Sequence, residues 1–347
     1  MKESCVDSLP RAFGGPKGSG VIRRELADFI VEEISSVEPS GEGEHVLLHI
    51  EKAGANTDWV AKQLARHADV PNKDVSFAGL KDRYAVTRQW FSVRLAGRDE
   101  PDWSALNSDE VQVLAAERHN RKLKRGALKG NKFVIRIREL DGERQRMAEI
   151  LEQIEAEGVP NYFGEQRFGY QDRNIESARA LFAGELKRVP RAKRSFYLSA
   201  ARSLLFNQLL AERVRAGNWN RIIAGERCLL AGSRSSFIAE ELDDELHCRC
   251  RERDIHPSAP LWGRGKPDVD GAALAFETEV LNGHQEWMAG LEKFGLEKER
   301  RSLRADVSEL NWEWGDELLT LSFTLPKGSF ATALLRELLD YREDERG

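Results

Sequence analysis

The stretch Phe77-Ala-Gly-Leu-Lys-Asp-Arg-Tyr-Ala-Val-Thr-Arg-Gln-Trp90 indicates both a local fold and a chemistry. Residues 75–78 and 90–95 are rich in β-branched and aromatic side chains, which favours two strands. The residues between them form a turn or a short helix around Asp82. Gly79 follows the first strand, where it allows a sharp turn or a close approach to the backbone.

Asp82 lies between Lys81 and Arg83. Cationic neighbours favour the ionised form of a carboxyl group, and a carboxylate nucleophile must be ionised. The alternative is a solvated charge in a surface turn, since charged turns are common. Lys81 either tunes the charge of Asp82, reaches a phosphate, or is an ordinary turn residue. The residues alone leave these alternatives open.

The composition indicates a globular protein of two domains. The chain has 347 residues, of which 41% are apolar and 32% are charged. Eight Trp and fifteen Phe exclude a disordered chain. No stretch approaches the roughly 18 apolar residues of a membrane span, and four Cys do not form a disulfide framework. We therefore expect a cytoplasmic location, no membrane association and no obligate protein partner.

The charge is distributed unevenly, although the net charge is only −5. Residues 118–138 contain nine Lys or Arg and no acid, and residues 187–202 contain six Lys or Arg and no acid. Residues 306–347 contain ten acids and four bases. This segregation is typical of a polyanion-binding face on an otherwise acidic protein.

The first part of the chain has mixed α and β patterns. Residues 45–50 favour a strand, and Thr57 is a plausible N-cap for a helix that carries Trp59, Val60, Leu64 and Ala65. Phe133, Ile135 and Ile137 alternate with Val134, Arg136 and Arg138, as in a strand with one buried face. Met147, Ile150, Leu151 and Ile154 then follow helical spacing up to Gly158.

The middle of the chain differs in character from both ends. It contains a long helical pattern at residues 198–213, Gly- and Ser-rich loops and most of the Cys. Strand chemistry returns at residues 319–325, followed by a helix that opens with Ser329 as its N-cap and carries Ala333, Leu334 and Leu338 on one face. This order suits one domain interrupted by another.

Gly79, Lys81, Asp82, Ala85, Thr87 and Gln89 stand in the order G-x-K-D-x-x-A-x-T-x-Q, which resembles the signature of TruD-type pseudouridine synthases. Six further stretches resemble the family pattern in the same order. They are residues 28–32, 51–57, 121–123 with 128–133, 159–164 with 166–169, 199–202 with 206–207, and 328–332. Together these seven matches span some 300 residues.

The resemblance implies an enzyme that isomerises uridine to pseudouridine in tRNA, at uridine 13 in bacterial members, with Asp82 as the catalytic nucleophile. It also implies an α+β fold. A pseudouridine-synthase catalytic domain, with a mixed and largely antiparallel sheet, would comprise residues 1–158 plus 306–347. An inserted α/β TRUD domain would comprise residues 159–305, in agreement with the change of character at that point.

This isomerisation is redox-neutral, so we expect no cofactor and no metal. The uridine must leave its stack, which costs a few kcal/mol, and an aromatic ring recovers roughly 1–3 kcal/mol by stacking. Phe133 matches the family's stacking phenylalanine, although packing in the core is its alternative. Asn131 matches a polar residue able to hydrogen-bond a uracil edge. Phe330 matches a motif beside the pocket, and a hydrophobic staple is its alternative.

Arg23 departs from the family pattern, which commonly has Lys at this place. Arginine keeps the charge but has a different, forked geometry. The basic runs predict contacts to the RNA backbone, with a solvated loop as the alternative. The residues expected to make these contacts are Arg121, Lys122, Lys124, Arg125, Arg191, Lys193 and Arg194.

Other sites find little support in the sequence. His247, Cys248, Cys250 and His256 match no standard zinc spacing, and the Gly-rich residues 14–20 lack the ending of a P-loop. One rival function is a non-catalytic tRNA-binding or RNA-folding protein. Another is a glycoside-cleaving hydrolase, which requires a second carboxyl group that residues 77–90 lack.

Overall fold

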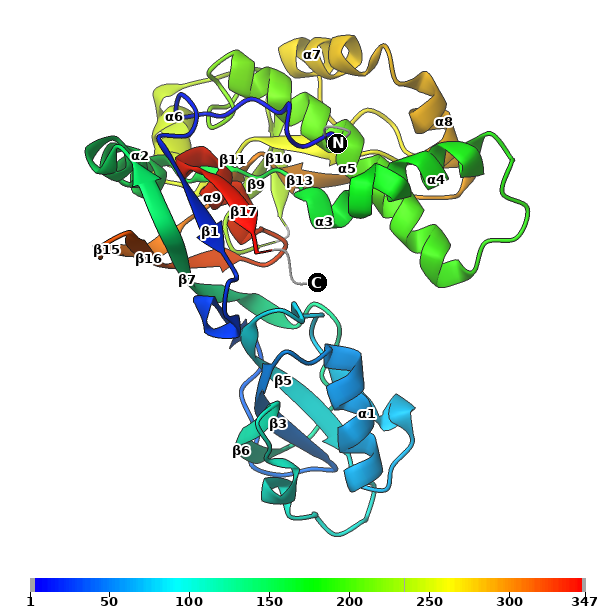
Figure 1. Cartoon of the computed structure of the whole chain (residues 1–347). Coiled ribbons are helices and arrows are strands. Elements are labelled where there is room, and N and C mark those ends of the chain that lie inside the picture. Colours follow the sequence, from blue (N-terminus) through cyan, green and yellow to red (C-terminus); the bar gives the residue numbers. More distant parts are fainter. Residues whose placement is uncertain (1–3, 234, 345–347) are drawn as a thin grey trace. The chain divides into compact units, whose positions relative to one another are not determined.

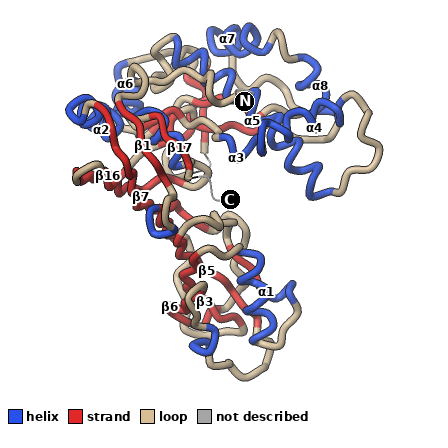
Figure 2. The backbone as a smooth tube through the Cα atoms, in the orientation of Figure 1, coloured by secondary structure: helices blue, strands red, loops and turns tan. Residues whose placement is uncertain are grey.

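The computed structural model describes residues 4–233 and 235–344, which form two compact units (Figures 1 and 2). The sheet unit comprises residues 17–144, 307–328 and 339 onward. The helical unit comprises the residues up to 16 together with 145–306 and 329–338. The helical unit thus includes residues 145–158 and 329–338, which the prediction assigned to the catalytic domain (1–158 plus 306–347). The two predicted domains remain a prediction from the family resemblance.

Within the described residues, one ten-stranded sheet forms the sheet unit, with the path β15-β16-β7-β2-β5-β3-β6. Only β1 with β17 and β2 with β5 pair in parallel among the described strands. The expected α+β fold with a mixed, largely antiparallel sheet is therefore confirmed. The strands are β1 (Gly18–Ile22), β2 (Phe29–Ser35), β3 (His45–Ala53), β4 (Val75–Phe77), β5 (Val86–Arg94), β6 (Val111–His119), β7 (Leu128–Gly142), β15 (Ser308–Trp314), β16 (Leu318–Pro326) and β17 (Asp340–Glu343).

The predicted alternation places β7 at the centre of this sheet. Phe133, Ile135 and Ile137 are buried, as the period of two requires. The strand pairs with β16 on one side and with β2 on the other. Beyond β2, helix α1 (Thr57–His67) packs Val60 and Leu64 into the core over β3 and β5 (Figure 1). Short 3-10 helices lie at Leu26–Asp28, Asn72–Asp74 and Trp103–Leu106.

The helical unit is organised around α5 (Arg191–Arg215), which starts seven residues before the predicted helical pattern. Its Leu205, Phe206 and Leu209 are fully buried in the core of the unit. Around it lie α2 (Arg144–Glu157), α3 (Glu165–Phe168), a 3-10 turn (Tyr170–Asp172), α4 (Arg173–Phe182), α6 (Asp244–Arg251), α7 (Gly271–Leu281), α8 (Gln285–Lys293) and α9 (Ala331–Leu338). No helix in the described part of the chain combines the length and the apolarity needed to cross a membrane.

Three small sheets complete the described part of the helical unit. They comprise β9 (Glu226–Leu230), β10 (Ser236–Ala239) and β11 (Ile255–His256); β12 (Ser258–Leu261) with β13 (Glu299–Ser302); and β8 (Val159–Pro160) with β14 (Arg304–Ala305). The mixture of helices and short strands agrees with the α/β character expected for the middle of the chain.

The predicted N-cap at Ser329 is wrong, because α9 begins only at Ala331. The Ser329 hydroxyl instead donates to Asn161 Oδ1 at 3.2 Å. The two reasons expected for Gly79 are also wrong. Its φ lies outside the left-handed region, and an added Cβ would meet no atom within 4 Å. The errors at Ser329 and Gly79 have the same cause. The local sequence does not show whether groups from distant parts of the chain approach a residue.

We predict that Gly130→Ala destabilises the sheet unit, whereas the matched change Gly79→Ala does not. A Cβ at Gly130 would lie 2.3 Å from the Leu325 carbonyl oxygen of β16, so the strands must move apart. Such overpacking costs about 1–3 kcal/mol, while a strain-free Gly→Ala change is neutral or slightly stabilising. Urea unfolding of both variants measures the difference. Equal stability of the two variants would contradict the close packing of β7 on β16.

Candidate active site

Asp82 lies on the irregular loop between β4 and β5, as predicted, and its carboxylate is paired with Arg23. Arg23 Nη2 donates to Asp82 Oδ2 at 2.9 Å, and Arg23 Nη1 donates to the Tyr84 carbonyl at 3.3 Å. The Arg23 side chain is 8% exposed, whereas that of Asp82 is 33% exposed. The arginine therefore pairs with the carboxylate from the protein side, while the carboxylate remains accessible from solvent.

Arg23 also connects Asp82 to a group of aromatic rings. Its guanidinium lies 4.0 Å from the centroid of Phe29, whose ring meets Phe133 edge to face at 6.2 Å. The φ of Arg23 is +60°, a value that non-glycine residues rarely adopt and that marks a backbone constrained by its surroundings. Arg23 is thus stacked on a ring and paired with the carboxylate at the same time.

The candidate site is built on one face of the sheet, because residues in register across neighbouring strands point the same way. Lys52, Thr87, Val31 and Phe133 follow one another across β3, β5, β2 and β7. One step further along the strands, Glu33 of β2 lies opposite Asn131 of β7. The Asp82 loop covers this part of the face through the contacts described next.

Lys52 is a buried cation under the loop. Its side chain has no exposed surface, and its ammonium donates to the Asp82 carbonyl oxygen at 2.8 Å. Burial lowers the pKa of Lys52 to about 8, despite the opposing attraction of Asp82. No ion pair to Lys52 occurs among residues 4–233 and 235–344. The lysine therefore fixes the backbone of Asp82 at an electrostatic cost to the fold.

Lys81 neither pairs with the Asp82 carboxylate nor extends into solvent. Its ammonium lies 2.8 Å from Glu33 Oε2 and donates to Asn131 Oδ1 at 2.9 Å. The side chains of Lys81 and Glu33 are 7% and 1% exposed. These contacts bind the loop to β2 and β7, and the expected roles of Lys81, tuning the charge of Asp82 or reaching a phosphate, stay predictions.

Thr57 and Gln89 complete the attachment of the loop. The predicted N-cap role of Thr57 is wrong, because Asn56 is the N-cap and Thr57 is the first helical residue. The Thr57 hydroxyl accepts from the Lys81 backbone N–H at 3.1 Å and donates to Gln89 Oε1 at 3.0 Å. Gln89 Nε2 in turn donates to the Gly79 carbonyl at 3.1 Å. Helix α1 and strand β5 therefore hold both sides of the loop.

Phe133 is only 7% exposed, and its ring stacks on Phe323 of β16 at 5.4 Å. Its contacts are those of a core residue, and the stacking role taken from the family stays a prediction. The exposed aromatic residue near Asp82 is Tyr84, at 51% exposure, and Leu80 is 61% exposed on the other side.

The predicted RNA contacts in the sheet unit lie on the loop between β6 and β7. Arg121, Lys122, Lys124 and Arg125 are all exposed, and the ion pairs of the described residues include none of them. This basic loop is attached to the Asp82 loop, since Gly126 N–H donates to the Ala78 carbonyl at 2.8 Å. The flanking Arg118 and Arg138 are instead ion-paired to Glu100 and Asp28.

The remaining predicted site residues belong to the helical unit. Phe330 is half-buried, with its ring 6.0 Å from Phe163 and 6.0 Å from the Arg167 guanidinium. Arg191, Lys193 and Arg194 are exposed in the first turn of α5. The structure describes the two units separately, so it brings Arg23, Lys81, Asp82, Asn131 and Phe133 together and does not place these four residues beside them.

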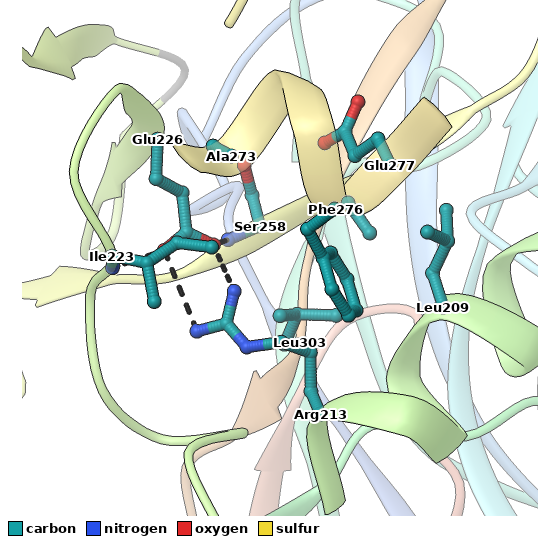
Figure 3. A pocket seen from close by; sticks show the side chains of 10 residues that line it. Leu209, Arg213, Ile223, Glu226, Ser258, Ala273, Phe276, Glu277 and Leu303 are labelled. Atoms are coloured by element: carbon teal, nitrogen blue, oxygen red, sulfur yellow. Dashed lines mark hydrogen bonds and ion pairs between the residues drawn. The ribbon is translucent and has the colours of Figure 1, made fainter. Parts of the chain in front are cut away.

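A small cavity in the helical unit is structural. It is lined by Arg213, Glu226 and Phe276 among others, and its volume of about 10 Å³ suits one water molecule (Figure 3). Arg213 and Glu226 form a buried ion pair at 3.0 Å. Burial raises the pKa of the neighbouring Glu277. Among the described residues, no group of three or more His, Cys, Asp or Glu side chains could hold a metal ion.

Sequence reasoning missed Lys52 and Glu33, although both left a signal. Lys52 continues the buried alternation of Leu48 and Ile50 on β3, and Glu33 continues that of Phe29 and Val31 on β2. A charge in phase with core residues requires a buried partner. That requirement could have been recognised, but the identity of the partner could not.

Comparisons with known proteins find relatives that cover nearly the whole chain. Residues 12–186 and 173–338 match the family model described as tRNA pseudouridine synthase D (TruD). The chain is 50% identical to tRNA pseudouridine synthase D of Methylococcus capsulatus, over 96% of this chain and 95% of the relative. It is 46% identical to the protein of that name from Aeromonas salmonicida, over 99% and 97%. A solved TruD structure from Methanosarcina mazei shares the fold, with a TM-score of 0.73, 22% identity and 95% coverage of both chains.

We predict that the stabilisation gained on replacing Lys52 by Met decreases as the pH rises. Below about pH 8 the buried ammonium is charged in both folded and unfolded chains, and its burial costs about 3 kcal/mol, since the pKa falls from 10.5 to about 8. Between these pKa values the unfolded chain binds the extra proton, so the wild type gains stability with pH. Urea unfolding of both proteins from about pH 7 to about pH 10 measures the difference. A difference that is independent of pH would contradict the burial of a charged Lys52.

Proposed function

Because the chain belongs to the TruD family of tRNA pseudouridine synthases, which are isomerases, we propose that it converts a uridine of tRNA, uridine 13, to pseudouridine with Asp82 as the nucleophile. The single observation that carries the proposal is the accessible Asp82 carboxylate, paired with the buried guanidinium of Arg23 at 2.9 Å. The carboxylate is thus held by a cation and open to a substrate.

The reaction breaks the N1–C1′ bond of uridine and forms a C5–C1′ bond. The proton on C5 is lost and N1 regains one, so the product is an isomer of the substrate. Asp82 supplies the negatively charged oxygen that attacks the nucleoside. Lys52 and Arg23 hold the two ends of this residue, one at its carbonyl and the other at its carboxylate. A nucleophile held at both ends loses little freedom when the substrate binds.

The flipped base needs contacts that replace its lost stacking. Tyr84 offers an exposed ring two residues after Asp82, and Phe133 lies beyond Phe29 and Arg23. We assign the stacking contact to this aromatic neighbourhood. Phe330 belongs to the helical unit, and its part in substrate binding stays a prediction from the family resemblance.

The tRNA backbone is bound by two basic groups in this proposal. One is the exposed loop of Arg121, Lys122, Lys124 and Arg125, which is bonded to the Asp82 loop. The other consists of Arg191, Lys193 and Arg194 at the start of α5, where cations oppose the helix dipole by a few tenths of a kcal/mol. Cations at such a place are better explained by an external anion than by helix stability.

Two other functions are weaker. A hydrolase would need a second carboxyl group as an acid near Asp82. The nearby Glu33 is ion-paired with Lys81 and 1% exposed, and Glu343 is ion-paired with Arg23 at 3.4 Å. A non-catalytic RNA-binding protein would need the basic loop but would not require a buried arginine to hold Asp82.

We predict that Asp82→Asn abolishes pseudouridine formation and leaves tRNA affinity within about threefold of the wild type, because the amide cannot act as a nucleophile but keeps the shape. Pseudouridine mapping in a tRNA transcript and filter binding measure the two effects. The matched control is Asp58→Asn on the exposed side of α1, which should remain active. Activity in the Asp82→Asn variant would refute the assigned nucleophile, and release of free uracil would favour the hydrolase.

We also predict that Lys124→Gln and Arg125→Gln each weaken tRNA binding and reduce its salt dependence. Each lost phosphate contact should lower the slope of log Kd against log salt by about 0.7–0.9. Arg98→Gln is the control, because this arginine is already paired with Asp69 on the same unit. An unchanged slope in the two loop variants would place the RNA on another surface.

A further inference from the structure

Leu80 and Lys81 are adjacent on the Asp82 loop, and their side chains are arranged in the opposite way to that favoured by the hydrophobic effect. Leu80 is 61% exposed, whereas the cationic side chain of Lys81 is 7% exposed. Ala78 and Ala85, the smaller apolar residues of the loop, are buried. The largest aliphatic side chain of the loop therefore remains in solvent while a charge is buried beside it, an arrangement that needs a reason.

The backbone is anchored on both sides of Leu80. The Gly79 carbonyl accepts a hydrogen bond from Gln89 Nε2 at 3.1 Å. The Lys81 N–H donates to the Thr57 hydroxyl at 3.1 Å. Bringing Leu80 into the core would require this part of the loop to turn over, which would break both hydrogen bonds. The contacts that anchor the loop therefore also hold Leu80 at the surface.

Leu80 lies between the two features that the proposed function requires. Asp82 follows it by two residues, and Ala78 precedes it by two residues. The Ala78 carbonyl accepts the hydrogen bond from Gly126 that attaches the basic loop. Four residues of chain span at most roughly 14 Å, so an RNA segment bound by the basic loop passes close to both Leu80 and Asp82.

We propose that Leu80 is an apolar wedge that enters the base stack of the RNA when the target uridine leaves it. This inference rests on the proposed function and goes beyond it by naming the residue that occupies the vacated place. Proteins that unstack nucleic acids insert apolar side chains, Leu among them, between neighbouring bases. Such a side chain must be apolar, exposed before the RNA binds and held by an anchored backbone, and Leu80 meets all three requirements.

The wedge acts on the equilibrium that precedes the chemistry. A stacked uridine is out of reach of the Asp82 carboxylate, and its extrusion leaves a neighbouring base without a contact on one face. Leu80 covers this face and displaces water from it, which stabilises the extruded state. Because only the extruded uridine reacts, the rate at saturating enzyme follows the extruded fraction.

Tyr84 and Leu80 differ in the contact that each can make. They stand two residues after and two residues before Asp82, and both are exposed. The flat ring of Tyr84 suits stacking on the extruded base, as proposed above. The branched aliphatic side chain of Leu80 has no flat face and suits the filling of a gap in the stack. The two residues therefore serve the two ends of the same movement of the uridine.

Two tRNA transcripts separate a wedge from any other role of Leu80. One is intact, and in the other the nucleotide that faces the target uridine is replaced by an abasic residue, so that extrusion costs less. Leu80→Ala should lower the single-turnover rate at saturating enzyme about tenfold on the intact transcript and less than about threefold on the abasic one. Leu80→Met keeps the apolar volume and should stay within about threefold of the wild type on both.

Leu114→Ala is the matched control. Leu114 is another leucine of the sheet unit, is 48% exposed and belongs to β6 instead of the Asp82 loop. This variant should leave the rates on both transcripts unchanged. Thermal melting checks that the variants are folded, which we expect of Leu80→Ala because it removes atoms that are mostly in solvent.

A second measurement follows extrusion without chemistry. The base next to the target is replaced by 2-aminopurine, whose fluorescence rises when a stacked neighbour leaves. The fluorescence should rise when Asp82→Asn binds this transcript. Adding Leu80→Ala should reduce the rise at saturating protein by at least about half.

The outcomes distinguish this inference from the proposed function. If the wild-type protein forms no pseudouridine on either transcript, the proposed function fails. If it is active but Leu80→Ala loses the same factor on both transcripts, or less than about twofold on the intact one, the wedge is refuted while the function stands. A loss confined to the intact transcript, together with a smaller fluorescence rise, supports the wedge.

Discussion

The loop that carries Asp82 is held in position by cationic side chains that are buried in the protein interior. Lys52 rises from β3 to the Asp82 carbonyl, Lys81 extends from the loop to Glu33 and Asn131, and Arg23 holds the carboxylate. Each of these side chains is nearly or fully buried. Burying a cation is unfavourable, and a hydrophobic replacement of a buried ion pair is often more stable. We interpret the unfavourable free energy of burying these cations as the consequence of holding the Asp82 loop in one position.

The same cations divide the tasks around the carboxylate. Lys52 acts on the backbone, Arg23 acts on the carboxylate, and Lys81 acts away from it, on Asn131. Lys81 is therefore adjacent to Asp82 in the sequence but does not pair with the Asp82 carboxylate. Arg23, which lies 59 positions away in the chain, pairs with the carboxylate instead.

The sequence predicted the regular parts of this structure well. The alternation of Phe133, Ile135 and Ile137 gave β7, and the loop between two strands gave the position of Asp82. It predicted poorly wherever a side chain is used by a distant partner. The hydroxyl of Thr57 looks like a helix cap but joins the loop, and Ser329 bonds to Asn161. Capping rules consider only hydrogen bonds between a side chain and the nearby backbone. In this protein the two hydroxyl groups make hydrogen bonds to distant residues instead of capping helices.

The sheet takes β7 from residues 128–142 and its partner β16 from residues 318–326, with most of the helical unit between them. On the ribosome, a nascent chain that has reached residue 306 has a nucleophile loop but lacks the strand that covers one edge of β7. That edge stays open until β16 itself has been made, and closing so long a loop is slow. Competence for catalysis is thus acquired late in synthesis, and a prematurely terminated product would expose an unpaired strand to quality control.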